Sequence, residues 1–133
     1  MWAIAALPPQ LELPRSLRLW GAMVLGVIGL AVMFSGVIAF RHAHTTINPL
    51  KPETATALVS GGIYSFTRNP MYLGILLVLL AWGVYLASLW VFLGPLLFAL
   101  YITRFQILPE EAALEKLFGS PFLEYRKRVR RWL

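Results

Sequence analysis

Polar side chains that could bind a ligand gather in the stretch TRNPMYLG and just before it. Tyr64, Arg68 and Tyr72 stand at four-residue spacing, which brings side chains to one face of a helix that begins early enough. A cation and two phenols beside several glycines have the composition of a ligand pocket. A purely structural role stays open as well, because Asn69 is a favoured helix N-cap and Pro70 a favoured first-turn residue.

A pair of glutamates forms the second polar cluster. Glu110 is followed by apolar residues at i+4, i+7 and i+8, so we expect its side chain on the apolar face of a helix, with Glu111 on a flanking face. A carboxylate on an apolar face needs a partner, so Glu110 should meet a cation, a hydroxyl-bearing ligand or helix amides. The alternative is that both glutamates only complement the dipole of a first helical turn.

Other chemistries find less support in the sequence. His42 and His44 stand two residues apart, and the chain has no cysteine and no aspartate, so no metal site is predicted. The formal net charge is +6, but the basic residues flank apolar stretches, where anionic lipid and the positive-inside rule account for them. We therefore expect a membrane, and no nucleic acid, as a partner.

The elements that carry these residues are expected to be membrane helices, because 59% of the chain is hydrophobic and only 14% is charged. A strand-like pattern is absent, so we predict one all-α domain over residues 1–133. Residues 19–40 are uncharged and would span about 33 Å as a helix, which predicts a transmembrane segment. Residues 1–18 are predicted to form an interfacial lead-in or a re-entrant segment.

The next apolar segment is too long for one span. Residues 69–103 carry no charge, and a single helix of that length would measure about 52 Å, beyond a hydrocarbon core of about 30 Å. We predict a tight helical hairpin over residues 70–108, with its turn near residues 85–88 and about three spans in all. Gly94 and Pro95 are expected to kink the second arm.

Residues 109–133 predict two short amphipathic helices. Gly119 should end the first helix, and Ser120 should cap the second. Apolar residues at helical spacing among many basic ones predict that the second helix lies on the membrane surface; they are Phe122, Tyr125, Val129 and Trp132. The basic residues of this tail and of the 41–69 loop favour a cytoplasmic location for both.

Two sequence blocks resemble a known family, the membrane methyltransferases related to isoprenylcysteine carboxyl methyltransferase and to the phospholipid methyltransferases. LVSGGIYSFTRNPMYLG, residues 58–74, resembles the family's Gly-x-Tyr and Arg-His/Asn-Pro-x-Tyr-x-Gly block. Residues 104–133 resemble its second block, with paired glutamates, Phe-Gly and a tyrosine before a basic helix. With residues 46–49, the resemblance covers roughly residues 19–133, and the length agrees with compact bacterial members.

The resemblance implies an S-adenosylmethionine site at the cytoplasmic ends of the hairpin. The residues expected to line it are Gly62, Tyr64, Arg68, Asn69, Pro70, Tyr72, Leu73, Gly74, Glu110 and Glu111. Arg104 matches the basic residue that the family places near the reacting substrate, and it is a candidate catalytic residue together with Asn69. Eukaryotic relatives have histidine where this chain has Asn69, so an imidazole acid or base is not implied here.

The implied function is S-adenosylmethionine-dependent methyl transfer to a membrane-embedded lipid, lipidated or amphipathic substrate. Carboxyl O-methylation is favoured, because methyl transfer to a carboxylate needs alignment and no strong base. Amine N-methylation stays possible, with Glu110 or Glu111 as the proton acceptor. The expected location is the bacterial inner (plasma) membrane, with a cytoplasmic catalytic face. The alternatives are an NADPH-dependent sterol-type reductase and a non-catalytic membrane adaptor.

Overall fold

The fold of the described chain is all-α. The computed structural model describes residues 1–45 and 54–133, so residues 46–49 of the family resemblance lie outside the described residues. The described part contains no β-strand. In chain order its elements are η1 (Trp2–Ile4), α1 (Arg15–His42), η3 (Gly62–Ser65), α2 (Pro70–Leu86), η4 (Leu89–Phe92), α3 (Leu93–Ile102), the π-helix η5 (Thr103–Ile107), α4 (Leu108–Phe118) and α5 (Ser120–Arg128).

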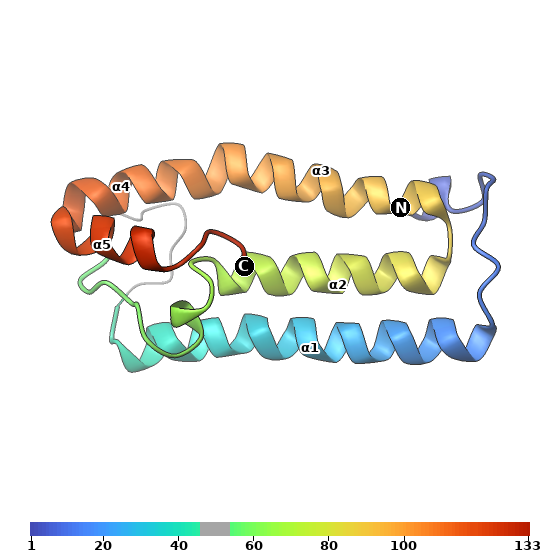
Figure 1. The fold of residues 1–133 in the computed structure, drawn as a ribbon, viewed down its shortest axis with the longest axis horizontal. Coiled ribbons are helices and arrows are strands. Elements are labelled where there is room, and N and C mark those ends of the chain that lie inside the picture. Colours follow the sequence, from blue (N-terminus) through green and yellow to red (C-terminus); the bar gives the residue numbers. More distant parts are fainter. Residues whose placement is uncertain (46–53) are drawn as a thin grey trace.

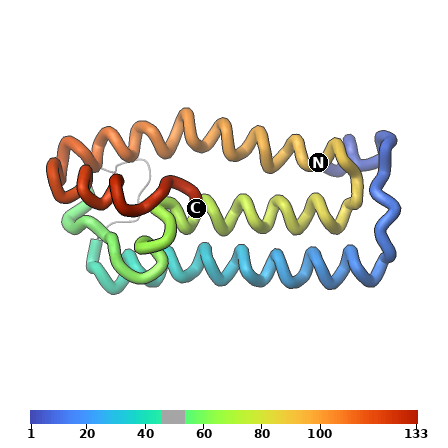
Figure 2. Tube along the Cα trace, viewed as in Figure 1, coloured from blue at the N-terminus to red at the C-terminus, as the bar shows by residue number. Residues whose placement is uncertain are grey.

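Three long rods lie side by side along the molecule (Figure 1). The middle rod, α2, packs against α1 on one side and α3 on the other. The third rod runs through α3, η5 and α4 as one bent helical stretch, and α5 then folds back along α4, as the tube shows (Figure 2). The loop with η3, the start of α2, and helices α4 and α5 therefore meet at one end of the molecule, which we call the polar end.

Glycines allow α1 and α2 to approach closely. A Cβ atom at Gly74 would lie 2.5 Å from the Gly29 carbonyl oxygen and 2.6 Å from the Met33 Cβ. A Cβ at Gly36 would lie 3.0 Å from the Pro70 ring. Small residues are the usual means by which membrane helices bring their backbones into contact. This packing fixes the start of α2, and the polar residues just before it, relative to α1.

The hairpin turn lies where the sequence predicted it. Helix α2 ends at Leu86, and Ala87 adopts the left-handed conformation with φ of 48°. The N-terminal segment covers this turn: the Leu11 N–H donates to the Ala87 carbonyl oxygen at 2.8 Å, and Trp90 Nε1 donates to the Pro8 carbonyl oxygen at 2.8 Å. The expected lead-in is also shorter than residues 1–18, because α1 already begins at Arg15.

The second arm is interrupted at a different place from the one predicted. Gly94 and Pro95 lie in the first turn of α3, where a proline removes no intrahelical hydrogen bond. The interruption is instead η5, Thr103–Ile107, which winds as a π-helix immediately before α4. Pro109 in the first turn of α4 lacks an N–H, so the carbonyls of the preceding turn must find other donors.

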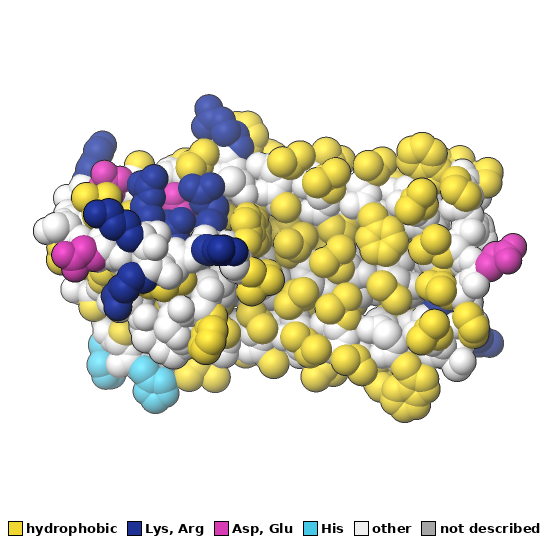
Figure 3. All heavy atoms as spheres, viewed as in Figure 1, with side chains coloured by type: hydrophobic (Ala, Val, Ile, Leu, Met, Phe, Trp, Pro, Cys, Tyr) yellow, Lys and Arg dark blue, Asp and Glu magenta, His cyan; other side chains and the backbone are white. Residues whose placement is uncertain are grey.

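An apolar surface covers the middle of the molecule, and charged side chains gather mainly at the polar end (Figure 3). Among the described residues, two helical stretches are long and apolar enough to cross a membrane, Arg15–His42 and Leu89–Phe118. Helix α2 is also apolar but has only 17 residues, about 26 Å at 1.5 Å per residue. Two candidate spans are therefore supported by length, and a third span through α2 stays a prediction.

The apolar face of α5 packs inside the protein rather than being left open for lipid, and the position of α5 on the membrane surface stays a prediction. Phe122, Tyr125 and Val129 form a buried cluster with Tyr64. The helix ends at Arg128, and its N-cap is Gly119, with φ of 62°, rather than Ser120. An amphipathic pattern records only that one face avoids water, and here the loop around η3 provides the covering surface.

Candidate functional site

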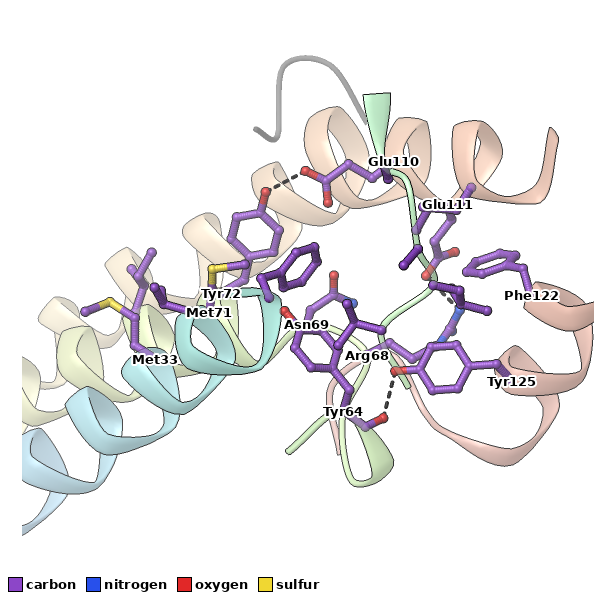
Figure 4. A pocket seen from close by; sticks show the side chains of 18 residues that line it. Met33, Tyr64, Arg68, Asn69, Met71, Tyr72, Glu110, Glu111, Phe122 and Tyr125 are labelled. Atoms are coloured by element: carbon purple, nitrogen blue, oxygen red, sulfur yellow. Dashed lines mark hydrogen bonds and ion pairs between the residues drawn. The ribbon is translucent and has the colours of Figure 1, made fainter. Parts of the chain in front are cut away.

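A cavity of about 380 Å³ opens at the polar end, between α1, the loop with η3, the start of α2, and helices α4 and α5 (Figure 4). Its size falls within the usual range for small-molecule sites. The side chains that line it are those of Met33, Val37, Phe40, Ala55, Ala57, Leu58, Val59, Tyr64, Arg68, Asn69, Met71, Tyr72, Ile75, Glu110, Glu111, Leu114, Phe122 and Tyr125. Most of the wall is apolar, and a few polar groups converge on it.

Six of the ten residues expected to hold the cofactor line this cavity. They are Tyr64, Arg68, Asn69, Tyr72, Glu110 and Glu111. The other four, Gly62, Pro70, Leu73 and Gly74, do not line it. Pro70 and Gly74 face α1, Leu73 is buried, and Gly62 adopts a positive φ of 59° at the start of η3. These four residues contribute to the backbone conformation from which the neighbouring side chains extend into the cavity.

Of the two expected catalytic residues, the structure brings only Asn69 to the cavity. Asn69 is the N-cap residue of α2, but its side-chain Nδ2 donates to the Arg131 carbonyl oxygen at 3.0 Å instead of capping the helix. Arg104 lies in η5, is exposed, and does not line the cavity. Its guanidinium carbon lies 5.9 Å from the ring centre of Phe105.

Glu110 is held at the cavity by neutral partners. The Tyr72 hydroxyl and Gln106 Nε2 each donate to Glu110 Oε1, both at 2.7 Å. Within residues 1–45 and 54–133, no ion pair involves Glu110. The expected partners were a cation, a hydroxyl-bearing ligand or helix amides, whereas the observed partners are a phenol and a side-chain amide of the protein. A half-buried carboxylate without a cation is a suitable partner for a positively charged or hydroxyl-bearing ligand group.

Glu111 is the more buried of the two glutamates, with 7% of its surface exposed, which corrects its expected flanking position. It accepts two hydrogen bonds from Arg131, at 2.9 and 2.8 Å, and forms an ion pair with Arg68 at 3.0 Å. The prediction assumed that the apolar face of α4 is packed, but part of this face, at Leu117, is exposed. The burial of Glu111 comes from residues distant in sequence.

Arg68 retains unused hydrogen-bonding capacity inside the cavity wall. Its side chain is only 9% exposed, and its Nε is buried without a hydrogen-bond partner in the described part of the chain. Its Nη1 faces Glu111 as an ion pair without hydrogen-bond geometry. Burial lowers the pKa of Arg68, and Glu111 opposes that effect, while the hydrogen bonds from Arg131 to Glu111 raise the pKa of Arg131.

Two buried tyrosines join the loop to α5. The Tyr125 hydroxyl donates to the Tyr64 carbonyl oxygen at 2.7 Å, and the ring of Tyr64 packs edge-on against Phe40, with ring centres 5.4 Å apart. Burial raises the pKa of both tyrosines above its ordinary value, so both stay neutral. The phenol rings contribute aromatic surface to the cavity.

Sequence reasoning missed several residues of the site. Tyr125 belonged to the predicted apolar face of the last helix, so its burial could have been found but its place in the cavity could not. Arg131 is one of several basic residues near the C-terminus, and nothing in the sequence distinguishes it from its neighbours. Gln106 and the residues of α1 carried no motif signal.

The site offers complementary groups to a ligand of mixed character. Glu110 provides a negative group, Arg68 provides a positive group with an N–H that no described residue pairs, and the aromatic and methionine side chains provide a broad apolar wall. Such a set suits a small molecule that carries an ammonium group, a carboxylate and a flat ring. The residues described include no cluster of three or more potential metal ligands.

Comparison with known proteins relates the chain to membrane methyltransferases. A family described as phospholipid methyltransferase matches residues 17–121. A protein-S-isoprenylcysteine O-methyltransferase of Schizosaccharomyces pombe is 37% identical over 105 residues, which are 77% of this chain and 43% of that protein. Protein-S-isoprenylcysteine O-methyltransferase B of Arabidopsis thaliana is 27% identical over 106 residues, 77% of this chain and 52% of that protein.

A third relative is an uncharacterized protein of Haemophilus influenzae, 48% identical over 63 residues, which are 47% of this chain and all of that protein. The chain thus spans about half the length of the two named methyltransferases that it matches. No solved structure matches it significantly.

Proposed function

Because the chain belongs to the phospholipid methyltransferase family, we propose that its cavity binds S-adenosylmethionine for methyl transfer to a membrane-embedded substrate. The observation that carries this proposal is the cavity at the polar end, where six residues of the two family-like blocks converge. Figure 4 shows Tyr64, Arg68, Asn69, Tyr72, Glu110 and Glu111 around one space.

The cavity residues fit the chemistry of this cofactor. S-adenosylmethionine supplies a methyl group activated by a positively charged sulfur. Glu110, whose protein partners are neutral, suits the ammonium group or a ribose hydroxyl. Arg68, with its unpaired Nε, suits the carboxylate of the amino-acid part. The rings of Tyr64, Tyr72 and Phe122 offer contact surface to the adenine.

The substrate is proposed to be a lipid, a lipidated molecule or an amphipathic compound that enters from the membrane. Met33 and Val37 of α1 and Ile75 of α2 line the cavity, and the same helices carry the apolar surface along the middle of the molecule. An apolar substrate could therefore reach the cavity sideways without crossing water. The two named relatives are protein-S-isoprenylcysteine O-methyltransferases, so lipid-linked acceptors are known among related proteins.

Carboxyl O-methylation is the favoured reaction. A carboxylate is already a nucleophile at neutral pH, so the protein needs only to hold it in line with the methyl group. The relatives' names state O-methylation. If the acceptor is an amine, Glu110 is the cavity residue placed to accept its proton, because Glu111 is already bound by two arginines. Arg104 lies outside the cavity, so we propose for it only a role in the approach of the substrate to the cavity.

The membrane arrangement proposed is three spans, through α1, α2 and the α3–α4 rod, with the polar end in the cytoplasm of a bacterial inner membrane. Basic residues gather at the polar end, which the positive-inside rule favours for the cytoplasm. Arg15 and Arg18 at the opposite end oppose this orientation, but Arg18 is engaged by the Tyr85 carbonyl oxygen of the hairpin turn.

Radiolabelled methyl transfer tests the proposed function. Membranes that contain the protein are incubated with S-adenosylmethionine carrying a labelled methyl group, and the organic extract is then treated with base. We expect label that base releases as methanol, as a methyl ester requires, and its loss in Glu110→Gln. Base-stable label would indicate N-methylation. Absence of label above that of membranes without the protein, together with NADPH-dependent reduction of a sterol, would replace the proposal by the reductase alternative.

A further inference from the structure

The last residues of the chain are bound to the loop that carries Arg68, although more than sixty positions separate them. The Arg68 N–H donates to the Arg130 carbonyl oxygen at 3.0 Å. Asn69 Nδ2 and Thr67 Oγ1 both donate to the Arg131 carbonyl oxygen, at 3.0 and 3.3 Å. Three consecutive loop residues therefore fix the backbone from which the Arg131 side chain starts.

From this fixed position Arg131 binds both carboxylate oxygens of Glu111. Its Nε donates to Oε1 at 2.9 Å, and its Nη2 donates to Oε2 at 2.8 Å. Arg68 Nη1 lies 3.0 Å from Oε1, the oxygen that also accepts from Arg131 Nε, but this contact lacks hydrogen-bond geometry. A two-point arginine–carboxylate pair is the stronger of these two interactions. Glu111 is thus compensated mainly by Arg131, and the three groups together carry a net charge of +1.

The remaining positive charge belongs to Arg68, which is the more buried of the two arginines. Arg68 lines the cavity with 9% of its side chain exposed, whereas Arg131 does not line the cavity and is 31% exposed. The Nε of Arg68 is buried and has no hydrogen-bond partner among the described residues. A buried guanidinium with an unused N–H requires an acceptor, and an anionic ligand group would supply one.

We propose that Arg131 is a positioning residue: by binding Glu111 at two points, it leaves the excess positive charge of Arg68, and the Nε that no described residue pairs, available to the carboxylate of the ligand. This inference rests on the proposed function and assigns one ligand group to one side chain. Without Arg131, Glu111 would turn to Arg68 as its sole cation and take up the charge and the N–H groups that the ligand needs. Arg131 acts on the ligand only through Glu111 and Arg68.

Two ligands that differ in one carboxylate test the inference. Binding of S-adenosylhomocysteine and of its decarboxylated analogue is measured on the full chain in detergent. Arg131→Gln should weaken S-adenosylhomocysteine binding about tenfold, while binding of the analogue changes less than about twofold. Arg131→Lys, which keeps the charge but not the two-point geometry, should recover part of the loss. Arg128→Gln removes an exposed charge from α5 and should change neither affinity.

The double variant Glu111→Gln/Arg131→Gln provides a second comparison. Because a neutral amide at position 111 cannot neutralise Arg68, this variant should bind S-adenosylhomocysteine more tightly than Arg131→Gln alone. Equal losses for both ligands in Arg131→Gln would show a merely structural role and overturn the inference. Unchanged S-adenosylhomocysteine binding would also overturn it while leaving the proposed function intact. Failure of the unaltered protein to bind either ligand would overturn the proposed function and the inference together.

Discussion

Among single residues, Tyr125 joins helix α5 to the loop that contains η3. Its hydroxyl donates to the Tyr64 carbonyl oxygen at 2.7 Å inside a cluster where only 4% of Tyr125 is exposed. Tyr125→Phe keeps the ring but leaves that carbonyl oxygen without this donor. We expect a loss of about 1 kcal/mol in the free energy of unfolding, measured by chemical denaturation in detergent. Leu123→Ala, on the partly exposed side of α5, is the comparison and should cost less.

Because Tyr64 and Tyr125 are buried, we expect the stability of the protein to be sensitive to alkali. Burial raises the pKa of Tyr64 and Tyr125 above the ordinary value of 10.0, so the folded chain keeps protons that the unfolded chain loses. Stability from this source is complete below pH 10 and falls as the pH rises above it. We expect the unfolding free energy to decrease above about pH 10, with a smaller decrease in Tyr125→Phe. A slope identical in both proteins would show that Tyr125 does not hold its proton.

The two glutamates show how far residue-level prediction reached. The sequence predicted a partner for Glu110 and assigned the inward position to it from the spacing of apolar residues, with Glu111 on a flanking face. In the structure Glu111 is the more buried, because Arg68 and Arg131 come to it from distant parts of the chain. Helical spacing describes one helix, and it contains no information about which of two faces another segment will cover.

At the scale of elements, close packing of α1 against α2 holds the start of α2 in place. Gly74→Ala would put a Cβ atom 2.5 Å from the Gly29 carbonyl oxygen, so the helices must separate. We expect a loss of about 1–3 kcal/mol in unfolding free energy and weaker cofactor binding, because Tyr72 lies on the same helix. Gly26→Ala is the matched control.

The Gly26 control has room for the added methyl group, since its nearest neighbour would be the Ala81 Cβ at 3.8 Å. It should be neutral or slightly stabilising, because alanine favours helix more than glycine does. Equal behaviour of the two variants would contradict the role assigned to the Gly29–Gly74 contact. Denaturant midpoints for the two variants and the unaltered protein are sufficient for the comparison.

Element prediction succeeded where a strong local signal acts and failed where packing decides. The hairpin turn and the break at Gly119 follow from the limit on span length and from a glycine with positive φ. The π-helix at Thr103–Ile107 was not predicted, because the sequence shows only Pro109 and not how the preceding turn adapts. The burial of the apolar face of α5 inside the protein was not predicted, since a buried protein face and a membrane face require the same amphipathic pattern.

For the whole molecule, the distribution of charged groups is the basis of the proposed orientation in the membrane. The polar end carries the cavity and most charged side chains, and the hairpin turn with the N-terminal segment forms the other end. The chain has no cysteine, so a single introduced cysteine reports one position. In bacterial cells we expect Lys127→Cys to react with a membrane-impermeant maleimide only after lysis, and Glu12→Cys to react in intact cells.

This labelling pattern follows from three spans and a cytoplasmic cavity. Both residues are exposed in the structure, so lack of reaction in intact cells would reflect the membrane barrier. The reverse pattern would place the cavity outside the cytoplasm, away from the cytoplasmic supply of S-adenosylmethionine. Labelling of both positions from one side would contradict an odd number of spans.

The proposed S-adenosylmethionine site is tested by calorimetric titration of the purified protein with S-adenosylhomocysteine. We predict binding in the micromolar range that Glu110→Gln weakens at least about tenfold and that Glu115→Gln, at an exposed ion pair on the same helix, leaves unchanged. NADPH should not bind. Binding of NADPH alone, or S-adenosylhomocysteine binding that is indifferent to Glu110→Gln, would contradict the account.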